Sequence, residues 1–227
     1  MNEPLLEPAQ NSQTWQVQDL DIGFEKQIIV SNISFSVSLG DSLAITGTNG
    51  CGKSCLLKTL ASMIPVKAGT IQAPPGFSHA ALGVVPQVTD FQPRLPISLR
   101  EMVSLGVCGS AQKASKESIK QALEDVGLSM TQAKQLWEQS SGGERQRTLI
   151  ARALIRQPQV LLLDEASSHL DPTSTETIFS LLKQRCRDHK LVCIAVIHDP
   201  ALVTKYCNKH LIIAHGQAQI TDLDSDA

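Results

Sequence analysis

Short apolar runs alternate with amphipathic segments through the middle of the chain. Three runs, at 42–46, 160–163 and 191–197, carry apolar side chains on both alternating faces, as strands do when a parallel sheet buries them on both sides. Segments with helical spacing follow at 56–63 and 174–187. Strands that alternate with helices predict an α/β fold with a mostly parallel core sheet.

The pattern changes on either side of this core. Residues 15–39 alternate as an N-terminal antiparallel β flank does, whereas 98–142 are polar and helical in character and predict a small helical insertion. The ends, 1–14 and 220–227, have no apolar periodicity. We therefore expect a flexible N-terminal tail and an acidic C-terminal tail around one domain at 15–219.

Composition excludes several classes of protein. The chain has 227 residues, enough to bury a sizeable core, and 20 Lys plus Arg against 22 Asp plus Glu give a net charge of −2. This balance argues against a nucleic-acid partner or a basic membrane-surface protein. The six cysteines form no CxxC pair, and the longest apolar runs, such as the seven residues 191–197, fall far short of the ~20 that a membrane span needs. We expect a reduced cytosolic protein.

A glycine-rich segment directly follows the first buried run. It has the pattern GxxxxGKS and consists of Gly47, Thr48, Asn49, Gly50, Cys51, Gly52, Lys53 and Ser54. Glycines allow a tight loop whose backbone N–H groups face a phosphate, and a following helix directs the positive end of its dipole there. Lys53 is expected to reach the β- and γ-phosphates and Ser54 to hold Mg²⁺. The spacing predicts a P-loop NTPase, with Cys51 as a small loop-filling residue or, alternatively, a redox-sensitive thiol.

Two acids end the second buried run. Asp164 and Glu165 directly follow 160–163, at the carboxyl end of a strand, where open α/β sheets place their ligand chemistry. Asp164 is predicted to coordinate Mg²⁺, and Glu165 to orient or deprotonate the attacking water. Two acids can also simply close a strand, but the glycine-rich loop in the same chain favours the catalytic interpretation.

A third segment, 140–147, leads into a helix with apolar periodicity. Ser141 and Glu144 have the S-x-x-E spacing of a capping box, which is an ordinary helix start. Gly142 and Gly143 fall in the first helical turn, where each costs about 1 kcal/mol relative to alanine. The two glycines therefore predict a close approach of the backbone to another surface, such as a phosphate.

In their order and spacing these segments resemble the nucleotide-binding domain of ATP-binding cassette (ABC) ATPases, over about residues 15–219. The resemblance implies an adenine-stacking role for Phe24. It implies that Gln87 contacts Mg²⁺ and senses a membrane partner, and that His198 contacts the γ-phosphate.

The same resemblance implies a signature segment and a D-loop. Ser141, Gly142 and Gly143 are implied to contact ATP held by a second copy of the chain, and 168–171 resemble the D-loop. The chain departs from the family pattern at Ser140 and Glu144 in the signature, at Ala166 after the acidic pair, and at Ser168 and His169 in the D-loop.

The resemblance also implies a function. It is that of a Mg²⁺-dependent ATPase which docks on integral membrane permease subunits through its helical insertion and the Gln87 loop. A homodimer with composite ATP sites would lie peripherally on the cytoplasmic face of the inner membrane, served indirectly by a periplasmic or surface substrate-binding protein. The alternatives are a soluble ABC ATPase of DNA repair or translation, and a P-loop kinase or GTPase of another class. The first usually carries two cassettes or long coiled coils, and the second does not account for the signature and His198.

The stretch 91–106 bears on the cargo. It is similar to the loop of ATPases that energise bacterial zinc and manganese importers, although Leu95 and Ser98 depart from that pattern. Siderophore or vitamin import is the alternative cargo. The plainer interpretation of the stretch is that Pro96 and Gly106 bound a surface turn and the start of a helix.

Overall fold

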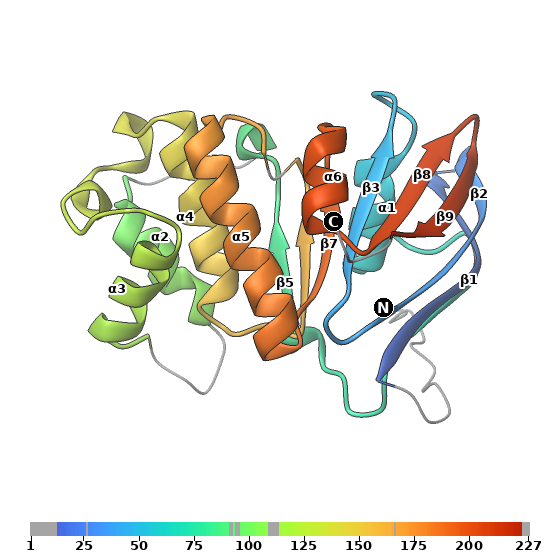
Figure 1. Ribbon diagram of the computed structural model, residues 1–227, viewed down its shortest axis with the longest axis horizontal. Coiled ribbons are helices and arrows are strands. Elements are labelled where there is room, and N and C mark those ends of the chain that lie inside the picture. The colour runs from blue at the N-terminus through green and yellow to red at the C-terminus, as the bar shows by residue number, and fades with distance from the viewer. Residues whose placement is uncertain are drawn as a thin grey trace.

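The central layer of the protein is a six-stranded sheet. The computed structural model describes residues 13–25, 27–90, 93, 96–108, 114–165 and 167–223, and the sheet has the strand order β5-β6-β7-β3-β8-β9 (Figure 1). Its strands are β3 (Ser42–Gly47), β5 (Leu82–Val85), β6 (Val160–Leu163), β7 (Val192–Val196), β8 (Lys209–Ala214) and β9 (Gln217–Asp222). All neighbours pair in parallel except β8 and β9. The predicted α/β fold with a mostly parallel core is confirmed.

The three runs that are apolar on both faces form β3, β6 and β7. Successive residues alternate between two hydrophobic cores, so that Leu161 and Leu163 belong to one and Val160 and Leu162 to the other. Burial on both faces explains why these strands lack the polar alternation of a half-exposed sheet.

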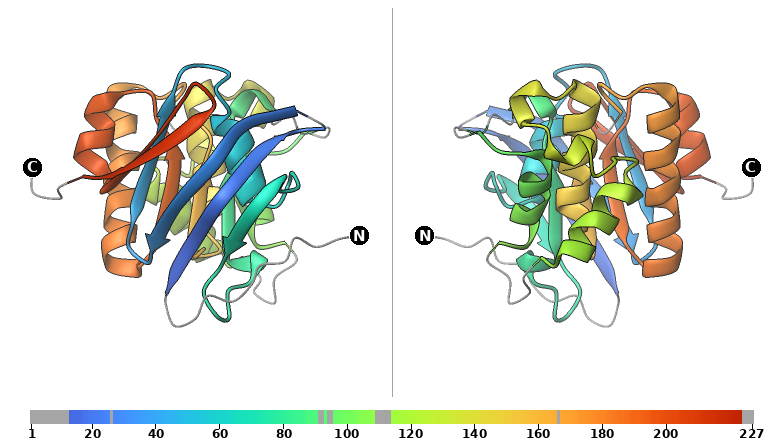
Figure 2. Two further views of the ribbon diagram at one scale, coloured as in Figure 1. Left: turned by 90° about the vertical axis from the view of Figure 1, so that its right-hand side faces the viewer. Right: turned by 90° about the vertical axis from the view of Figure 1, so that its left-hand side faces the viewer.

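The predicted N-terminal flank is an antiparallel sheet of order β2-β1-β4. It consists of β1 (Thr14–Phe24), β2 (Gln27–Ser38) and β4 (Ala68–Gln72) and is seen at the front of the left view in Figure 2. Its inward side chains, such as Val17 and Ile33, share a core with α1 (Lys53–Leu60) and one face of the central sheet.

The other face of the central sheet is covered by helices. These are α4 (Gly142–Leu154), α5 (Pro172–His189) and α6 (Pro200–Tyr206), together with α2 (Leu99–Ser104) and α3 (Lys116–Asp125). The last two fall in the predicted helical insertion and pack with α4 at one end of the molecule (Figure 1). Gly106 has no room for a side chain, because a Cβ there would lie 2.1 Å from the carbonyl oxygen of Arg152 in α4.

The predicted boundary of the acidic tail is wrong. Residues 220–222 belong to β9, where Ile220 pairs with Leu211 and Asp222 with Lys209. The Lys209 Nζ donates a hydrogen bond of 2.8 Å to Asp222 Oδ1. Pairing with β8, the preceding strand of the same hairpin, orders this segment, rather than local apolar periodicity. Residues 224–227 and the predicted tail up to residue 12 lie outside the described residues.

Among the residues that the structure describes, no helix has both the length and the hydrophobicity to cross a membrane. All six cysteine thiols are free. Cys55, Cys186 and Cys193 are buried, Cys51 and Cys207 are partly buried, and Cys108 is exposed. Burial raises the pKa of Cys207 to about 12 and also raises the pKa of Cys55.

Candidate functional site

The glycine-rich loop connects the end of β3 to the start of α1. Gly47 has φ +149° and Gly52, the residue before α1, has φ +110°. A Cβ at Gly47 would lie 2.3 Å from the carbonyl oxygen of Ile213 in β8, and one at Gly52 would lie 2.7 Å from Cγ2 of Val30 in β2. The loop is therefore compressed between two strands, which requires glycine at both positions.

Lys53 is buried at the first position of α1. Its Nζ donates hydrogen bonds of 2.9 Å to the carbonyl oxygens of Gly47 and Thr48. The ammonium group thus lies within the loop, at the N-terminal end of a helix that has no side-chain cap. Loop, cation and helix dipole together form a site for an anion.

Ser54 and Asp164 meet beside this loop. The Ser54 hydroxyl donates a hydrogen bond of 3.0 Å to Asp164 Oδ1. Burial raises the pKa of the Asp164 carboxyl, and the Ser54 hydrogen bond opposes this shift in part. A buried carboxylate beside a hydroxyl is the oxygen donor set that Mg²⁺ prefers, so the predicted pair fits that ion.

Three predicted catalytic residues come together at the ends of adjacent strands. Gln87 follows β5, Glu165 follows β6 and His198 follows β7, and the carboxyl ends of parallel strands meet at one edge of a sheet. The Gln87 Nε2 donates a 2.7 Å hydrogen bond to Glu165 Oε2. The His198 Nε2 lies 3.6 Å from Glu165 Oε1. The Glu165 carboxylate is therefore held between an amide and an imidazole.

Phe24 lies at the exposed end of β1 and is 49% exposed. The same strand places Cδ1 of Ile22 within 3.9 Å of the Cβ position at Gly52. Phe24 thus lies two residues after a side chain that contacts the loop, and its ring is exposed, as stacking on a base requires.

The signature residues begin α4, and the predicted capping box is present. Ser141 Oγ accepts a 3.2 Å hydrogen bond from the Glu144 N–H, and Glu144 Oε2 accepts one of 2.9 Å from the Ser141 N–H. The backbone hydrogen bond from Ser141 holds the pKa of Glu144 below its usual range.

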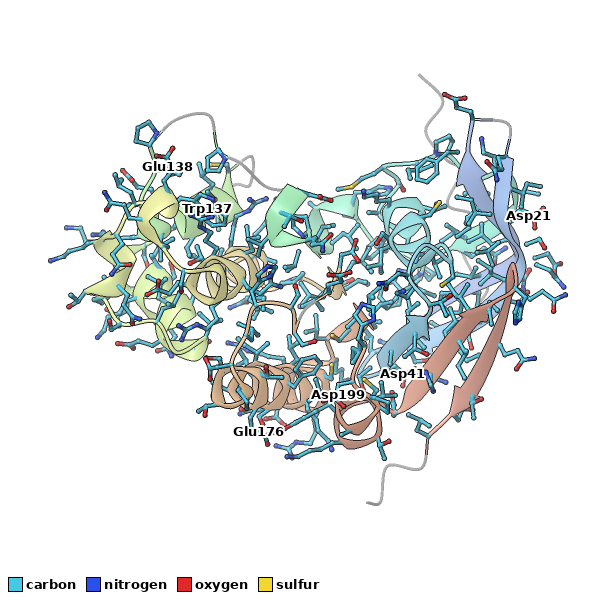
Figure 3. All side chains as sticks on the ribbon, turned by 90° about the horizontal axis from the view of Figure 1, so that it is seen from above. Asp21, Asp41, Trp137, Glu138, Glu176 and Asp199 are labelled. Atoms are coloured by element: carbon cyan, nitrogen blue, oxygen red, sulfur yellow. The ribbon has the colours of Figure 1, made fainter. Side chains whose placement is uncertain are left out.

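The start of α4 does not lie beside the phosphate loop of the same chain. α4 and α1 belong to different hydrophobic cores and lie apart in Figure 1, although Arg152 near the end of α4 and Leu57 of α1 line one groove. In Figure 3, Trp137 and Glu138, just before α4, lie at one end of the molecule and Asp21 lies at the other. One chain therefore brings the loop, Asp164 and Glu165 together and holds Ser141, Gly142 and Gly143 apart from them.

One contact was missed in the sequence. A Cβ at Gly142 would lie 3.1 Å from both Cβ and Cδ2 of His169, and one at Gly143 would lie 2.9 Å from the His169 carbonyl oxygen. The surface that the two glycines approach within the chain is thus the loop after β6. The two glycines predict a close approach to some surface, but the only sign in the sequence that His169 provides it is its departure from the family pattern.

The sequence pattern of the ABC transporter family matches residues 30–168. The chain belongs to the ABC transporter family. It is 34% identical over 201 residues to a zinc import ATP-binding protein of Aliivibrio fischeri, with 88% of this chain and 79% of the relative covered. It is 32% identical over 221 residues to a manganese transport system ATP-binding protein of Listeria monocytogenes, with 91% of each covered.

Another relative of this ABC ATPase is named for the transport of a different substance. The achromobactin transport ATP-binding protein of Dickeya dadantii is 30% identical over 212 residues, with 88% of this chain and 78% of the relative covered. A chain of an ABC transporter solved in an inward-facing conformation has a TM-score of 0.78 and 28% identity, covering 92% of this chain and 83% of its own. The protein is therefore an ABC-type ATPase subunit of transporters, with the fold of a P-loop NTPase.

Proposed function

We propose that this ATPase energises the import of a divalent transition metal, zinc or manganese. The observation that carries the proposal is the naming of its relatives: zinc and manganese transport proteins are 34% and 32% identical to it over most of the chain. In the stretch 91–106, which is similar to a loop of metal importers, residues 91, 92, 94 and 95 lie outside the described residues. Its described part starts α2 with a capping box formed by Ser98 and Glu101.

The chemistry is assigned to residues that the fold brings together. Glu165 accepts a proton from the water that attacks the γ-phosphate, and Gln87 and His198 hold its carboxylate in place. Lys53 and the N–H groups of the glycine-rich loop bind the phosphates, and Phe24 stacks on adenine.

Ser54, Asp164 and the Gln87 side-chain oxygen are the proposed ligands of Mg²⁺. When bound, the ion neutralises phosphate charge. Ionised Asp164 is disfavoured by burial, and a cation beside it removes that penalty.

A composite site follows from the separation of α4 and α1. We infer that two copies pair head to tail, so that Ser141, Gly142 and Gly143 of one copy face ATP on the loop of the other. Closed two-fold pairing uses the same surface twice and so completes both sites at once.

The permease is proposed to dock beside Gln87. A groove of about 260 Å³ lies between α1 and the Gln87 segment and is lined in part by Leu57, Ala61 and Met63. Met63 is 63% exposed, which suits contact with an apolar partner surface. Docking here places the ATPase peripherally on the cytoplasmic face of the membrane, with a periplasmic or surface binding protein acting on the far side.

The test is metal uptake in a strain that lacks this chain. We expect poor growth under metal chelation, rescue by added zinc or manganese, and reduced uptake of one labelled metal. A Glu165→Gln copy should restore neither growth nor uptake, because loss of a general base costs about 10²-fold or more in turnover. A Glu176→Gln copy, which removes an exposed ion pair between Glu176 of α5 and Lys205 of α6, is the matched control and should restore both.

The name of one relative supports a different transported substance. The achromobactin transport protein is 30% identical to this chain, in keeping with siderophore or vitamin import as the alternative. Normal uptake of both metals together with lost uptake of an iron–siderophore complex or a vitamin would replace the metal proposal with this one.

A further inference from the structure

The loop that carries the catalytic carboxylate is held in an unusual backbone conformation. Glu165 has φ +54° and His169 has φ +70°. Both values lie in the left-handed region that residues other than glycine rarely adopt, and such residues persist only where surrounding contacts impose them. The contacts that impose this conformation on Glu165 and His169 therefore matter for the position of the Glu165 carboxylate.

Ser168 supplies the first of these contacts. Its N–H and its Oγ both donate to the carbonyl oxygen of Glu165, at 3.0 and 2.8 Å. The hydroxyl hydrogen is thereby used, so the Ser168 oxygen is left as an acceptor.

His169 completes the network. Its Nδ1 lies 3.2 Å from Ser168 Oγ. Because the Ser168 hydrogen points to Glu165, the hydrogen in this contact belongs to Nδ1–H, which fixes the tautomer of the neutral imidazole. The ring thus supports the serine that holds the backbone of the catalytic glutamate.

The same ring reaches the signature helix. The Cβ and Cδ2 atoms of His169 occupy the space that a side chain at Gly142 would need, and the His169 carbonyl oxygen limits Gly143 in the same way. The first turn of α4 and the loop after β6 are therefore in direct contact through one residue.

We propose that His169 is a positioning residue that couples the signature turn of α4 to the catalytic Glu165 through Ser168. The proposal rests on the proposed role of Glu165. It adds that a movement of Gly142 and Gly143, when the partner's nucleotide binds there, is transmitted to Glu165 through the imidazole. His169 acts through Ser168 and need not touch ATP.

The test compares variants that tolerate the same backbone but differ in hydrogen bonding. Asparagine and aspartate both accept left-handed φ; His169→Asn keeps an N–H at the position of Nδ1, whereas His169→Asp has no donor. Ser168→Thr and Ser168→Ala form a second, uncharged pair that keeps or removes the hydroxyl. Mg²⁺–ATP hydrolysis by the full chain gives kcat and KM separately.

We expect His169→Asp and Ser168→Ala to lose roughly tenfold in kcat, the effect of one hydrogen bond, with little change in the KM for ATP. The Asn and Thr variants should stay within about threefold of the wild type. Equal kcat in the Asn and Asp variants, or a change in KM alone, would overturn the proposal.

A second measurement does not depend on turnover. In the wild-type chain, the nitrogen chemical shifts of His169 should show that Nδ1 is protonated and hydrogen-bonded. In Ser168→Ala the signal of this hydrogen bond should be absent. A protonated Nε2 in the neutral ring contradicts the proposal. Hydrolysis that survives in Glu165→Gln while this signal is present contradicts the role of Glu165 instead, so the two failures are distinguishable.

Discussion

Asp164 shows how a single residue can serve a site at the expense of the fold. Its carboxyl is buried at the end of β6, and burial raises its pKa in the folded protein. An acid whose pKa is higher in the folded than in the unfolded chain stabilises the fold below its unfolded pKa, and that contribution is lost as the pH rises through the folded pKa. At neutral pH the ionised group therefore disfavours folding.

Asp164→Asn should consequently stabilise the protein while abolishing Mg²⁺-dependent ATP hydrolysis. An amide keeps an acceptor for the Ser54 hydroxyl but carries no charge, so we expect the free energy of unfolding in urea and EDTA at neutral pH to rise by on the order of 1 kcal/mol. The gain should shrink as the pH falls through the raised pKa of the folded carboxyl, and it should be lost below the ordinary aspartate pKa of about 4. Lower stability of the variant at neutral pH would contradict this account.

Single residues of the site differ in how far the sequence predicts them. Lys53, Asp164 and Glu165 follow from short motifs next to buried runs, because one strand–loop–helix unit positions each of them. The Gln87–Glu165 hydrogen bond depends on β5 lying beside β6, which no local pattern specifies. His169 depends on a left-handed φ and on a contact with another helix.

Among the elements, α2 and α4 begin with the same device. Ser98 with Glu101 and Ser141 with Glu144 each form a complete capping box. The two helices differ in surroundings, since only α4 carries the glycines that contact His169. They therefore provide an internal comparison between a cap that only starts a helix and one at the proposed composite site.

Ser98→Ala and Ser141→Ala should lower the stability of the protein by similar amounts but differ in their effect on ATP turnover. Each removes one cap, which costs about 1 kcal/mol and is measurable by denaturant unfolding. Only Ser141→Ala should also reduce ATP turnover, since Ser141 faces the partner's nucleotide in the proposed dimer. Equal turnover in the two variants would mean that Ser141 serves solely as a cap.

The sequence predicts the strands buried on both faces closely, but not the end of the edge strand β9. The runs for β3, β6 and β7 coincide with the observed strands to within one residue at each end, because unbroken apolar character is local information. The predicted tail at 220–227 includes the last three residues of β9, since these residues gain order by pairing with β8.

At the scale of the whole molecule, the separation of the start of α4 from the phosphate loop is the basis of the proposed head-to-tail assembly. A change at Gly143 would disturb the chain itself, because the His169 carbonyl oxygen is already 2.9 Å from the Cβ position there. Ser141 is exposed and is a cap position, where aspartate is also favoured. Ser141→Asp therefore adds a negative charge towards the partner's phosphates and keeps a capping acceptor. It also replaces the 2.9 Å hydrogen bond from the Ser141 hydroxyl to Glu144 Oε2 with a like-charge contact, so its stability is measured beside that of Ser141→Ala.

Mixing two inactive proteins should restore activity if the sites are composite. The Lys53→Ala protein lacks the phosphate-binding cation but retains an intact signature segment. The Ser141→Asp protein retains an intact phosphate loop but has an altered signature segment. Each should be nearly inactive alone. An equal mixture should recover up to roughly a quarter of wild-type turnover, since half of the dimers are mixed and each has one working site; turnover no greater than the sum of the separate proteins would argue against head-to-tail pairing.

The distribution of thiols gives a practical means to follow such assembly. Buried Cys55 and Cys193 and partly buried Cys207 are shielded, and their raised pKa values keep them protonated and unreactive. Cys108, just after α2, is exposed. A maleimide dye at neutral pH therefore attaches preferentially to the helical insertion of the unaltered chain, which provides a native fluorescent reporter of how that insertion moves when nucleotide, partner copy or permease binds.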